Sequence, residues 1–126
     1  MDIYKQNYRR LIKILGPPDK LPEYLKLKSG GFMDLNLDVL GADGESITIA
    51  LSHYFVQNGD MIPDPDMEIR IYPEMRMAEA LTYQDSFGYR EVYPEPGRVD
   101  PAAKQDLNTF LGYWMGNLLK QGFRAD

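Results

Sequence analysis

The sequence predicts an α+β domain in which an antiparallel meander of four to five strands is flanked by an N-terminal and a C-terminal helix packed on one sheet face. Three observations predict this class. Apolar residues recur at helical spacing at both ends of the chain, apolar and polar residues alternate in the middle, and short turn-forming segments separate the alternating stretches. With 126 residues and no internal repeat, the chain is expected to form a single domain, residues 1–126.

The N-terminal helix is predicted over residues 3–15. Five apolar or aromatic side chains form one stripe along it: Tyr4, Tyr8, Leu11, Ile12 and Leu15. Asp2 is placed to cap its first turn, and Gly16-Pro17-Pro18 ends it, because proline lacks the backbone donor that the helix needs.

A separate face of this helix is basic, with Lys5, Arg9 and Lys13 four residues apart and Arg10 beside them. Such a face is usually solvated. The alternative is a docking surface for an acidic partner, for which the protein's own acidic sheet is one candidate.

The middle of the chain predicts the strands. Residues 19–31 are expected to form a connector with one helical turn around Pro22 to Leu25. Strands are expected at 32–39, 45–56, 67–72, 77–83 and, as a fifth, 89–93. Asp43-Gly44 predicts a tight hairpin between the first two. Asn58-Gly59-Asp60 ends the second, and Pro63 and Pro65 are expected to keep the next segment extended and unpaired.

The C-terminal helix is predicted to begin at Pro101, with Asp100 as its cap, after the stiff linker 94–98. Gly122 is expected to end it. Its spacing gives a core-facing stripe of mostly apolar residues: Leu107, Phe110, Leu111, Trp114, Leu118 and Gln121.

Amino-acid composition and charge limit the classes of function and partner that we expect for this protein. The formal net charge is −5, and residues 31–98 carry thirteen acidic and four basic side chains, so nucleic acid is an unfavourable partner for most of the surface. The absence of cysteine excludes thiolate chemistry and favours a cytoplasmic location. No apolar run approaches the length of a membrane-spanning helix, so we expect no membrane partner.

The densest carboxylate cluster is Asp60, Asp64, Asp66 and Glu68. In a regular extended chain residues 64, 66 and 68 point the same way, which would bring three oxygen ligands for Mg²⁺ or Ca²⁺ to one surface. The alternative is a solvated acidic edge that discourages strand-to-strand aggregation. A weaker similarity, Asp64 followed by Glu68-Ile69-Arg70, resembles the acidic motif of some metal-dependent nucleases.

The only histidine, His53, falls on the apolar face of its predicted strand, and Glu79 is expected on the same side. We therefore predict a structural polar pair between His53 and Glu79, since a buried carboxylate needs a partner. Tyr54 and Tyr72 belong to a group of tyrosines around the sheet and are candidate interaction aromatics. No phosphate-binding loop or dinucleotide fingerprint is present.

The chain resembles the YqiB-like proteins, a family of small bacterial proteins of unknown function. The resemblance is carried by Met67-Glu68-Ile69-Arg70-Ile71-Tyr72, Met77-Ala78-Glu79-Ala80, Lys104-x-x-Leu107-Asn108-x-Phe110-Leu111-x-x-Trp114, Tyr4-x-x-Asn7-x-x-x-Leu11 and Tyr93-Pro94. It implies a bacterial, soluble protein and brings no activity, cofactor or catalytic residue.

The preferred interpretation is a non-enzymatic interaction module that binds an unidentified protein through an acidic, tyrosine-rich sheet surface, with no catalytic residue and no cofactor. The competing hypothesis is a divalent-metal-dependent hydrolase or nuclease that uses the Asp60, Asp64, Asp66 and Glu68 cluster. Three of those carboxylates within reach of one ion would favour the enzyme, whereas carboxylates spread into solvent would favour the module.

Overall fold

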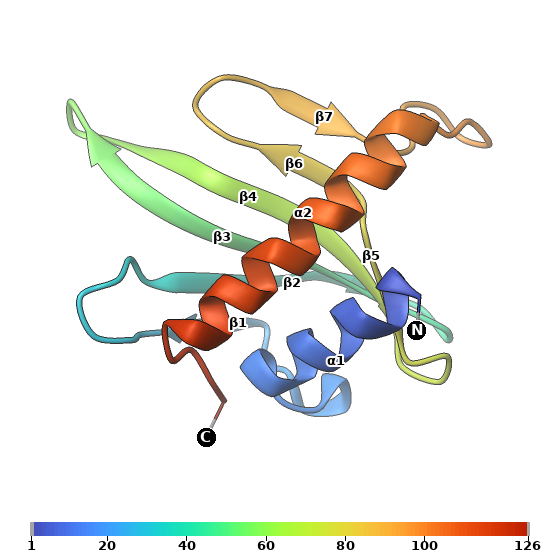
Figure 1. Ribbon diagram of the computed structural model, residues 1–126, viewed down its shortest axis with the longest axis horizontal. Coiled ribbons are helices and arrows are strands. Elements are labelled where there is room, and N and C mark those ends of the chain that lie inside the picture. The colour runs from blue at the N-terminus through green and yellow to red at the C-terminus, as the bar shows by residue number, and fades with distance from the viewer. Residues whose placement is uncertain (1, 126) are drawn as a thin grey trace.

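The computed structural model describes residues 2–125 (Figure 1). Its helices are α1 (Ile3–Leu15), the short 3₁₀ helix η1 (Pro18–Lys20) and α2 (Pro101–Lys120). Its strands are β1 (Tyr24–Leu27), β2 (Leu35–Ala42), β3 (Ile47–Gln57), β4 (Asp60–Tyr72), β5 (Met77–Ala80), β6 (Thr82–Gln84) and β7 (Tyr89–Glu91).

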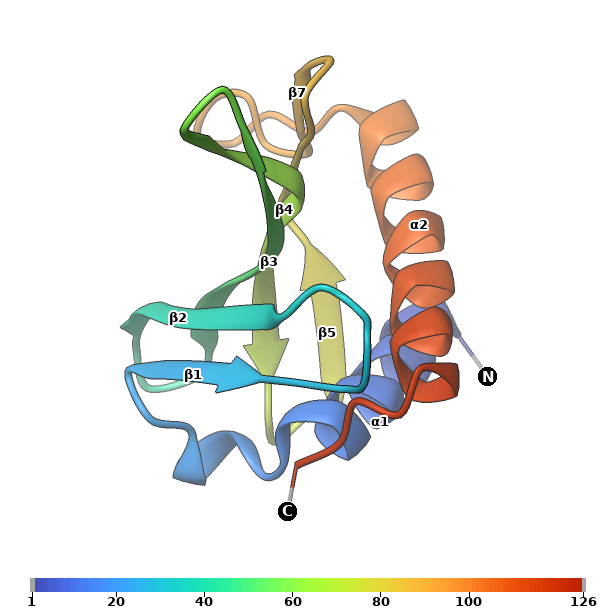
Figure 2. The same cartoon turned by 90° about the vertical axis from the view of Figure 1, so that its left-hand side faces the viewer.

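The predicted α+β class is confirmed. Within residues 2–125 the strands form one antiparallel sheet in the order β1-β2-β3-β4-β6-β7, with β5 also paired to β4. Seven strands exceed the four to five that were predicted. Figure 2 shows α1 and α2 on the same side of this twisted sheet.

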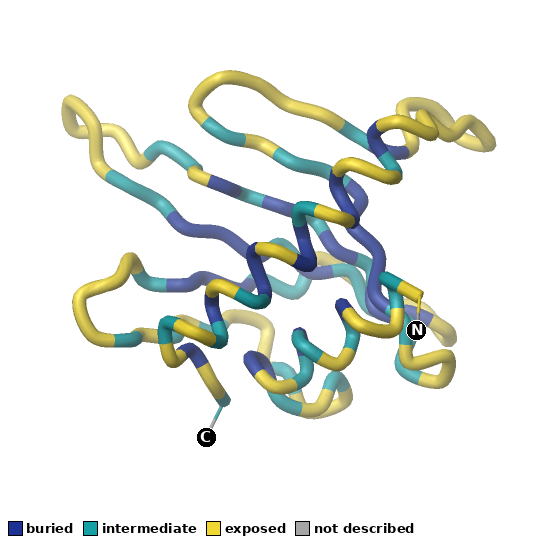
Figure 3. Tube along the Cα trace, viewed as in Figure 1, coloured by how far each residue is buried: buried dark blue, intermediate teal, exposed yellow. Residues whose placement is uncertain are grey.

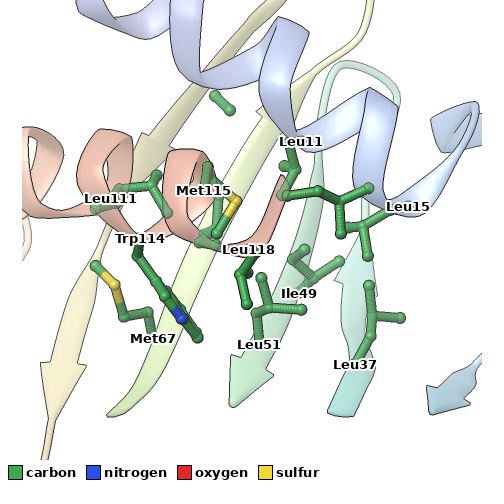
Figure 4. Close-up of a cluster of buried hydrophobic side chains, with 14 of the residues drawn as sticks. Leu11, Leu15, Leu37, Ile49, Leu51, Met67, Leu111, Trp114, Met115 and Leu118 are labelled. Atoms are coloured by element: carbon green, nitrogen blue, oxygen red, sulfur yellow. The ribbon is translucent and has the colours of Figure 1, made fainter. Parts of the chain in front are cut away.

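The core lies between the helices and the sheet (Figure 4). Alternate residues of β3 and β4 enter it, including Ile49, Leu51 and Met67, all 0% exposed. From the other side come residues of both helices: Leu11, Ile14, Leu15, Leu107, Leu111, Trp114, Met115 and Leu118. Six of these eight residues belong to the predicted apolar stripes; Ile14 and Met115 do not, and the predicted stripe residue Ile12 is only half-buried.

Both helices begin as predicted. The Asp2 carboxylate accepts from the backbone N–H of Lys5 at 2.9 Å, and the Asp100 carboxylate accepts from Ala103 at 3.1 Å. Gly16 follows α1 with a φ of 85°, a conformation that glycine adopts without steric cost.

The two helices approach closely at Gly112. The side chain of Arg10 donates to the Gly112 carbonyl at 2.9 Å, and Asn7 donates to the Asn108 carbonyl at 3.1 Å. A Cβ at Gly112 would lie 3.1 Å from the Asn7 side-chain oxygen, so this close approach is suited to glycine. Arg10 is thereby directed toward α2 rather than into the basic face of α1.

Two predictions for the connecting segments are wrong. The helical turn expected around Pro22 to Leu25 is instead the edge strand β1, in which Leu25 and Leu27 pack against the core. The segment around Pro63 is paired, because Asn58-Gly59 forms a two-residue turn and β4 pairs with β3 from Asp60 onward. Positive φ values at Asn58 (53°) and Gly59 (84°) suit such a tight hairpin.

A bulge interrupts this long hairpin. Ser52 pairs with Asp66, and Tyr54 pairs with Pro63, so Asp64 and Pro65 together stand opposite His53. One additional residue in β4 reverses the alternation of its side chains beyond that point. Asp64 therefore does not continue the row of Asp66 and Glu68, which the regular-strand prediction assumed.

The predicted strand 77–83 is divided into β5 and β6, and in β5 the inward face is the opposite of the one expected. Ala78 and Ala80 are 0% exposed and face the helices, because α1 and α2 pack directly against β5 and leave room only for small side chains. Glu79 pairs with Arg70 and lies on the other face. Figure 3 shows most of β5 buried beside the helices, and its first residue, Met77, is half-buried.

Candidate interaction surface

The sheet face opposite the helices holds the acidic residues in cross-strand rows. Partners in an antiparallel ladder share a face, so Asp38, Ala50 and Glu68 form one row. Asn36, Ser52 and Asp66 form the adjacent row, which Gln84 of β6 extends. The small Ala50 side chain separates Asp38 from Glu68, and the three carboxylates of Asp38, Asp66 and Glu68 make up what we call the acidic sheet face.

Electrostatics at this face disfavour its full ionisation. Burial raises the pKa of Asp66, and the negative charges of Glu68 and Asp38 raise it further, while a hydrogen bond from Tyr54 acts in the opposite direction. The ionised face is consequently under like-charge repulsion, which a cationic group from outside would relieve.

Tyrosines border the acidic sheet face. Tyr24, 51% exposed, donates to the Asn36 side-chain oxygen at 2.9 Å. Tyr89, 53% exposed, donates to Glu91 at 3.3 Å on the outermost strand. Tyr54, predicted as an interaction aromatic, is half-buried beside Asp66. Aromatic side chains with a polar end are frequent at protein interfaces.

The four predicted carboxylates do not form one cluster. Asp60 lies at the β3–β4 turn, and Asp64 lies in the bulge, where its charge contributes to a raised pKa of Tyr83. Asp60 and Asp66 are six residues apart along β4, a span of about 20 Å in an extended strand. Of the predicted set only Asp66 and Glu68 belong to the acidic sheet face.

Metal coordination requires ligands within about 2.0–2.6 Å of one ion. Among residues 2–125 no group of three or more histidine or carboxylate side chains is positioned to hold a metal ion. The geometry that the hydrolase hypothesis specified is therefore not formed by the described residues.

His53 and Glu79 do not pair, which corrects the sequence prediction. The Nδ1 atom of His53 lies 2.9 Å from the Asp34 carbonyl oxygen, and its ring packs edge-on against Trp114 with centroids 5.7 Å apart. Glu79 lies in the Arg70 row, which meets β3 at Thr48, five residues from His53. That is roughly 16 Å along the strand, and on the opposite face.

Glu79 instead organises a tyrosine cluster that sequence reasoning missed. Its two carboxylate oxygens accept from the hydroxyls of Tyr72 and Tyr93, each at 2.9 Å. The Lys104 ammonium lies over the ring of Tyr93, 5.9 Å from its centroid, and also over that of Tyr4 at 5.8 Å. Tyr72 is thus held within the protein by its hydroxyl rather than presented with the acidic sheet face.

The tyrosine cluster joins α1, β4, β5, the segment after β7, and α2. Burial and the hydrogen bond to Glu79 raise the pKa of Tyr93 to about 12. The Tyr72 hydrogen bond and the Glu79 charge raise the pKa of Arg70. With Glu79 only 9% exposed and both its oxygens occupied, the cluster is a structural junction. Its members are distant in sequence, so only their shared tyrosine–glutamate chemistry could have suggested it.

Comparisons with known proteins identify a family for this chain but no activity. No helix among the described residues is long and apolar enough to cross a membrane. Neither a curated protein nor a solved structure matches the chain. No comparison links it to the YqiB-like proteins in particular; the expectation of a family of unknown function is confirmed. A family model described as a domain of unknown function, DUF6908, matches residues 6–124, and the chain therefore belongs to that family.

Proposed function

We propose that this protein is an interaction module that binds a lysine- or arginine-bearing segment of another protein on the acidic sheet face. The observation that supports it most strongly is the pair of adjacent rows that hold Asp38, Asp66 and Glu68 on the sheet face opposite α1 and α2. The raised pKa of Asp66 also supports the proposal. A bound cation would offset the repulsion from Glu68 and Asp38 that contributes to the raised pKa.

Among the described residues, two cations lie on this face: Lys26, which is exposed at the β1 end of the Asn36 row, and Arg70. Arg70 lies in the next row, but it is held beside Tyr72 and Glu79, so its charge is compensated within the protein. Glu91 on β7 adds a further carboxylate in register with Thr82. The absence of cysteine in the sequence supports a cytoplasmic setting for the interaction, which stays a prediction.

The test is site-specific photocrosslinking followed by direct binding. A photoreactive residue at Gln84, exposed at the margin of the acidic sheet face, is expected to capture the partner in cells, whereas one at Tyr113, 71% exposed on α2, is not. The captured protein is then purified and titrated by calorimetry. Its binding segment should carry Lys or Arg, and its affinity should fall with ionic strength.

Two neutralised variants complete the test. Asp38→Asn, Asp66→Asn, Glu68→Gln removes the acidic sheet face and should weaken binding by about tenfold or more. Asp19→Asn, Asp60→Asn, Glu74→Gln removes three exposed carboxylates elsewhere and should change it less than about threefold. Equal effects of the two variants would show that only net charge matters, and capture from Tyr113 alone would show that the partner binds another surface.

A further inference from the structure

A second charged surface lies on the helix side of the molecule, away from the acidic sheet face. A hollow of about 670 Å³ runs along α1 and is lined by Lys5, Tyr8, Arg9, Ile12, Lys13 and Arg76. We call it the basic groove. Arg76 reaches it from the turn between β4 and β5, which lies beside α1 in Figure 1. The groove is thus built by two segments that are distant in sequence.

The groove combines cations with an apolar floor. Four of its six lining residues are Lys or Arg and none is acidic. Tyr8 and Ile12 are half-buried between the cations and offer apolar contact. A surface that is both basic and apolar suits a peptide with carboxylate and apolar side chains better than it suits bare phosphates.

The cations that α1 contributes to the basic groove are regularly spaced. Lys5, Arg9 and Lys13 are spaced by four residues on α1, a rise of about 6 Å per step. Carboxylates four residues apart on a helix repeat at the same distance, and those two residues apart in an extended chain repeat at about 6.7 Å. Successive acidic side chains of either form can therefore meet successive cations.

Charge outside the groove limits the occupant's length. The chain's formal net charge is −5 although the four groove cations contribute +4, so the remaining residues carry −9. A long polyanion such as nucleic acid would extend past the groove onto this negative surface and be repelled. A short acidic segment can be contained within the groove.

We infer that the basic groove binds a short acidic segment of a partner protein, one whose apolar side chains contact Tyr8 and Ile12. This goes beyond the binding of a basic segment on the acidic sheet face, because it adds a second site of opposite charge on the other side of the sheet. A protein with both sites would hold an acidic and a basic partner segment at once.

The experiment measures binding of a defined probe by fluorescence anisotropy. The probe is a fluorescein-labelled 12-residue peptide in which Glu alternates with Ala and Leu, and its control has Gln at every Glu position. A 12-nucleotide single-stranded DNA is titrated in parallel. The Glu peptide should bind, and should bind more weakly at 0.5 M salt, while the Gln peptide and the DNA should bind at least about tenfold more weakly.

A charge-reversed variant locates the site on both walls of the groove. Lys5→Glu, Lys13→Glu, Arg76→Glu should weaken binding of the Glu peptide by about tenfold or more. The matched control, Lys20→Glu, Lys120→Glu, Arg124→Glu, reverses three exposed cations elsewhere and should weaken it less than about threefold. Circular dichroism and a melting curve establish that each variant is folded; a neutral variant, Lys5→Gln, Lys13→Gln, Arg76→Gln, carries the test if reversal prevents folding.

Three results would each overturn the inference. Equal loss in the groove variant and its matched control would mean that only net charge matters. Tighter binding of the DNA, lost in the groove variant, would make this a nucleic-acid site. Sedimentation showing a wild-type dimer that both the groove variant and the Asp38→Asn, Asp66→Asn, Glu68→Gln variant dissociate would identify the occupant as the acidic sheet face of a second copy.

Discussion

Replacing Asp66 by Asn should stabilise the folded protein, although it removes a residue proposed to bind the partner. Burial raises the pKa of the Asp66 carboxyl above its ordinary value of 3.8, and Glu68 and Asp38 raise it further. All three effects act against the charged form of the carboxyl. An Asn at this position keeps a side-chain oxygen for Tyr54 and removes the repulsion.

The expected stabilisation by Asp66→Asn follows from the distances between the charges, which the strand register sets. Asp66 and Glu68 are two residues apart on one strand face, about 6.7 Å, and two unit charges at that distance in water repel by about 0.6 kcal/mol. Asp38 is two strands away in the adjacent row and adds a smaller amount. We expect a stabilisation of about 0.5–1 kcal/mol at low ionic strength. For a chain of 126 residues this raises Tm by about 2–4 °C.

The pH dependence has a defined sign. With its pKa raised, the folded protein binds this proton more tightly than the unfolded chain does, so ionised Asp66 costs stability above its folded pKa. The cost disappears as the pH falls toward 3.8. The difference in Tm between wild type and Asp66→Asn should therefore be largest at neutral pH and shrink under acid conditions.

The assay is urea denaturation and thermal melting of both proteins at pH 7 and pH 4, each in 10 mM and 500 mM salt. Asp60→Asn, an exposed carboxylate at the hairpin turn, is the control and should lie within about 0.5 kcal/mol of wild type. A less stable Asp66→Asn variant would refute the reasoning. So would a stabilisation that neither acid nor salt diminishes.

Two further predictions concern groups outside this face. Asn108→Ala should cost about 2 kcal/mol by urea denaturation, because the buried backbone N–H of Ala80 loses the Asn108 side-chain acceptor at 2.8 Å. The exposed neighbour change Thr109→Ala should cost less than about 0.5 kcal/mol, and similar losses in both would contradict this role. The pKa of Tyr93 is raised to about 12, so its stabilising contribution should be complete below pH 10 and lost as the pH rises toward 12. Glu79→Gln should move two tyrosines of the 295 nm absorbance titration, Tyr72 and Tyr93, to lower pH, and an unchanged curve would argue against the pairing.

The acidic sheet face was only partly predictable. Asp66 and Glu68 were identified because period-two alternation places them on one strand face, and the structure keeps them there. Asp38 was not connected with them, since cross-strand rows depend on register, and register depends on the turns on both sides. The single-residue bulge opposite His53 leaves no signal in the alternation of the sequence. Alternation alone therefore groups Asp60 and Asp64 with Asp66 and Glu68, and the structure separates them.

The junction around Glu79 shows the same limit. Alternation alone gives two equivalent choices of buried face for a short strand such as β5. The direct packing of α1 and α2 decides between them, because only Ala78 and Ala80 are small enough to lie beneath the helices. Glu79 is therefore directed to the two tyrosine hydroxyls rather than to His53.

The sequence by itself determined the local structure: the start of both helices at Asp2 and Asp100, their apolar stripes, and the alternation of the long central strands. These features depend on residues close in the chain, where capping and periodicity act. Tertiary structure alone decided which carboxylates share a face, which partners His53 and Glu79 take, and that Arg76 joins α1 in the basic groove. Each of those depends on strand register and helix packing, which bring together residues that no local pattern relates.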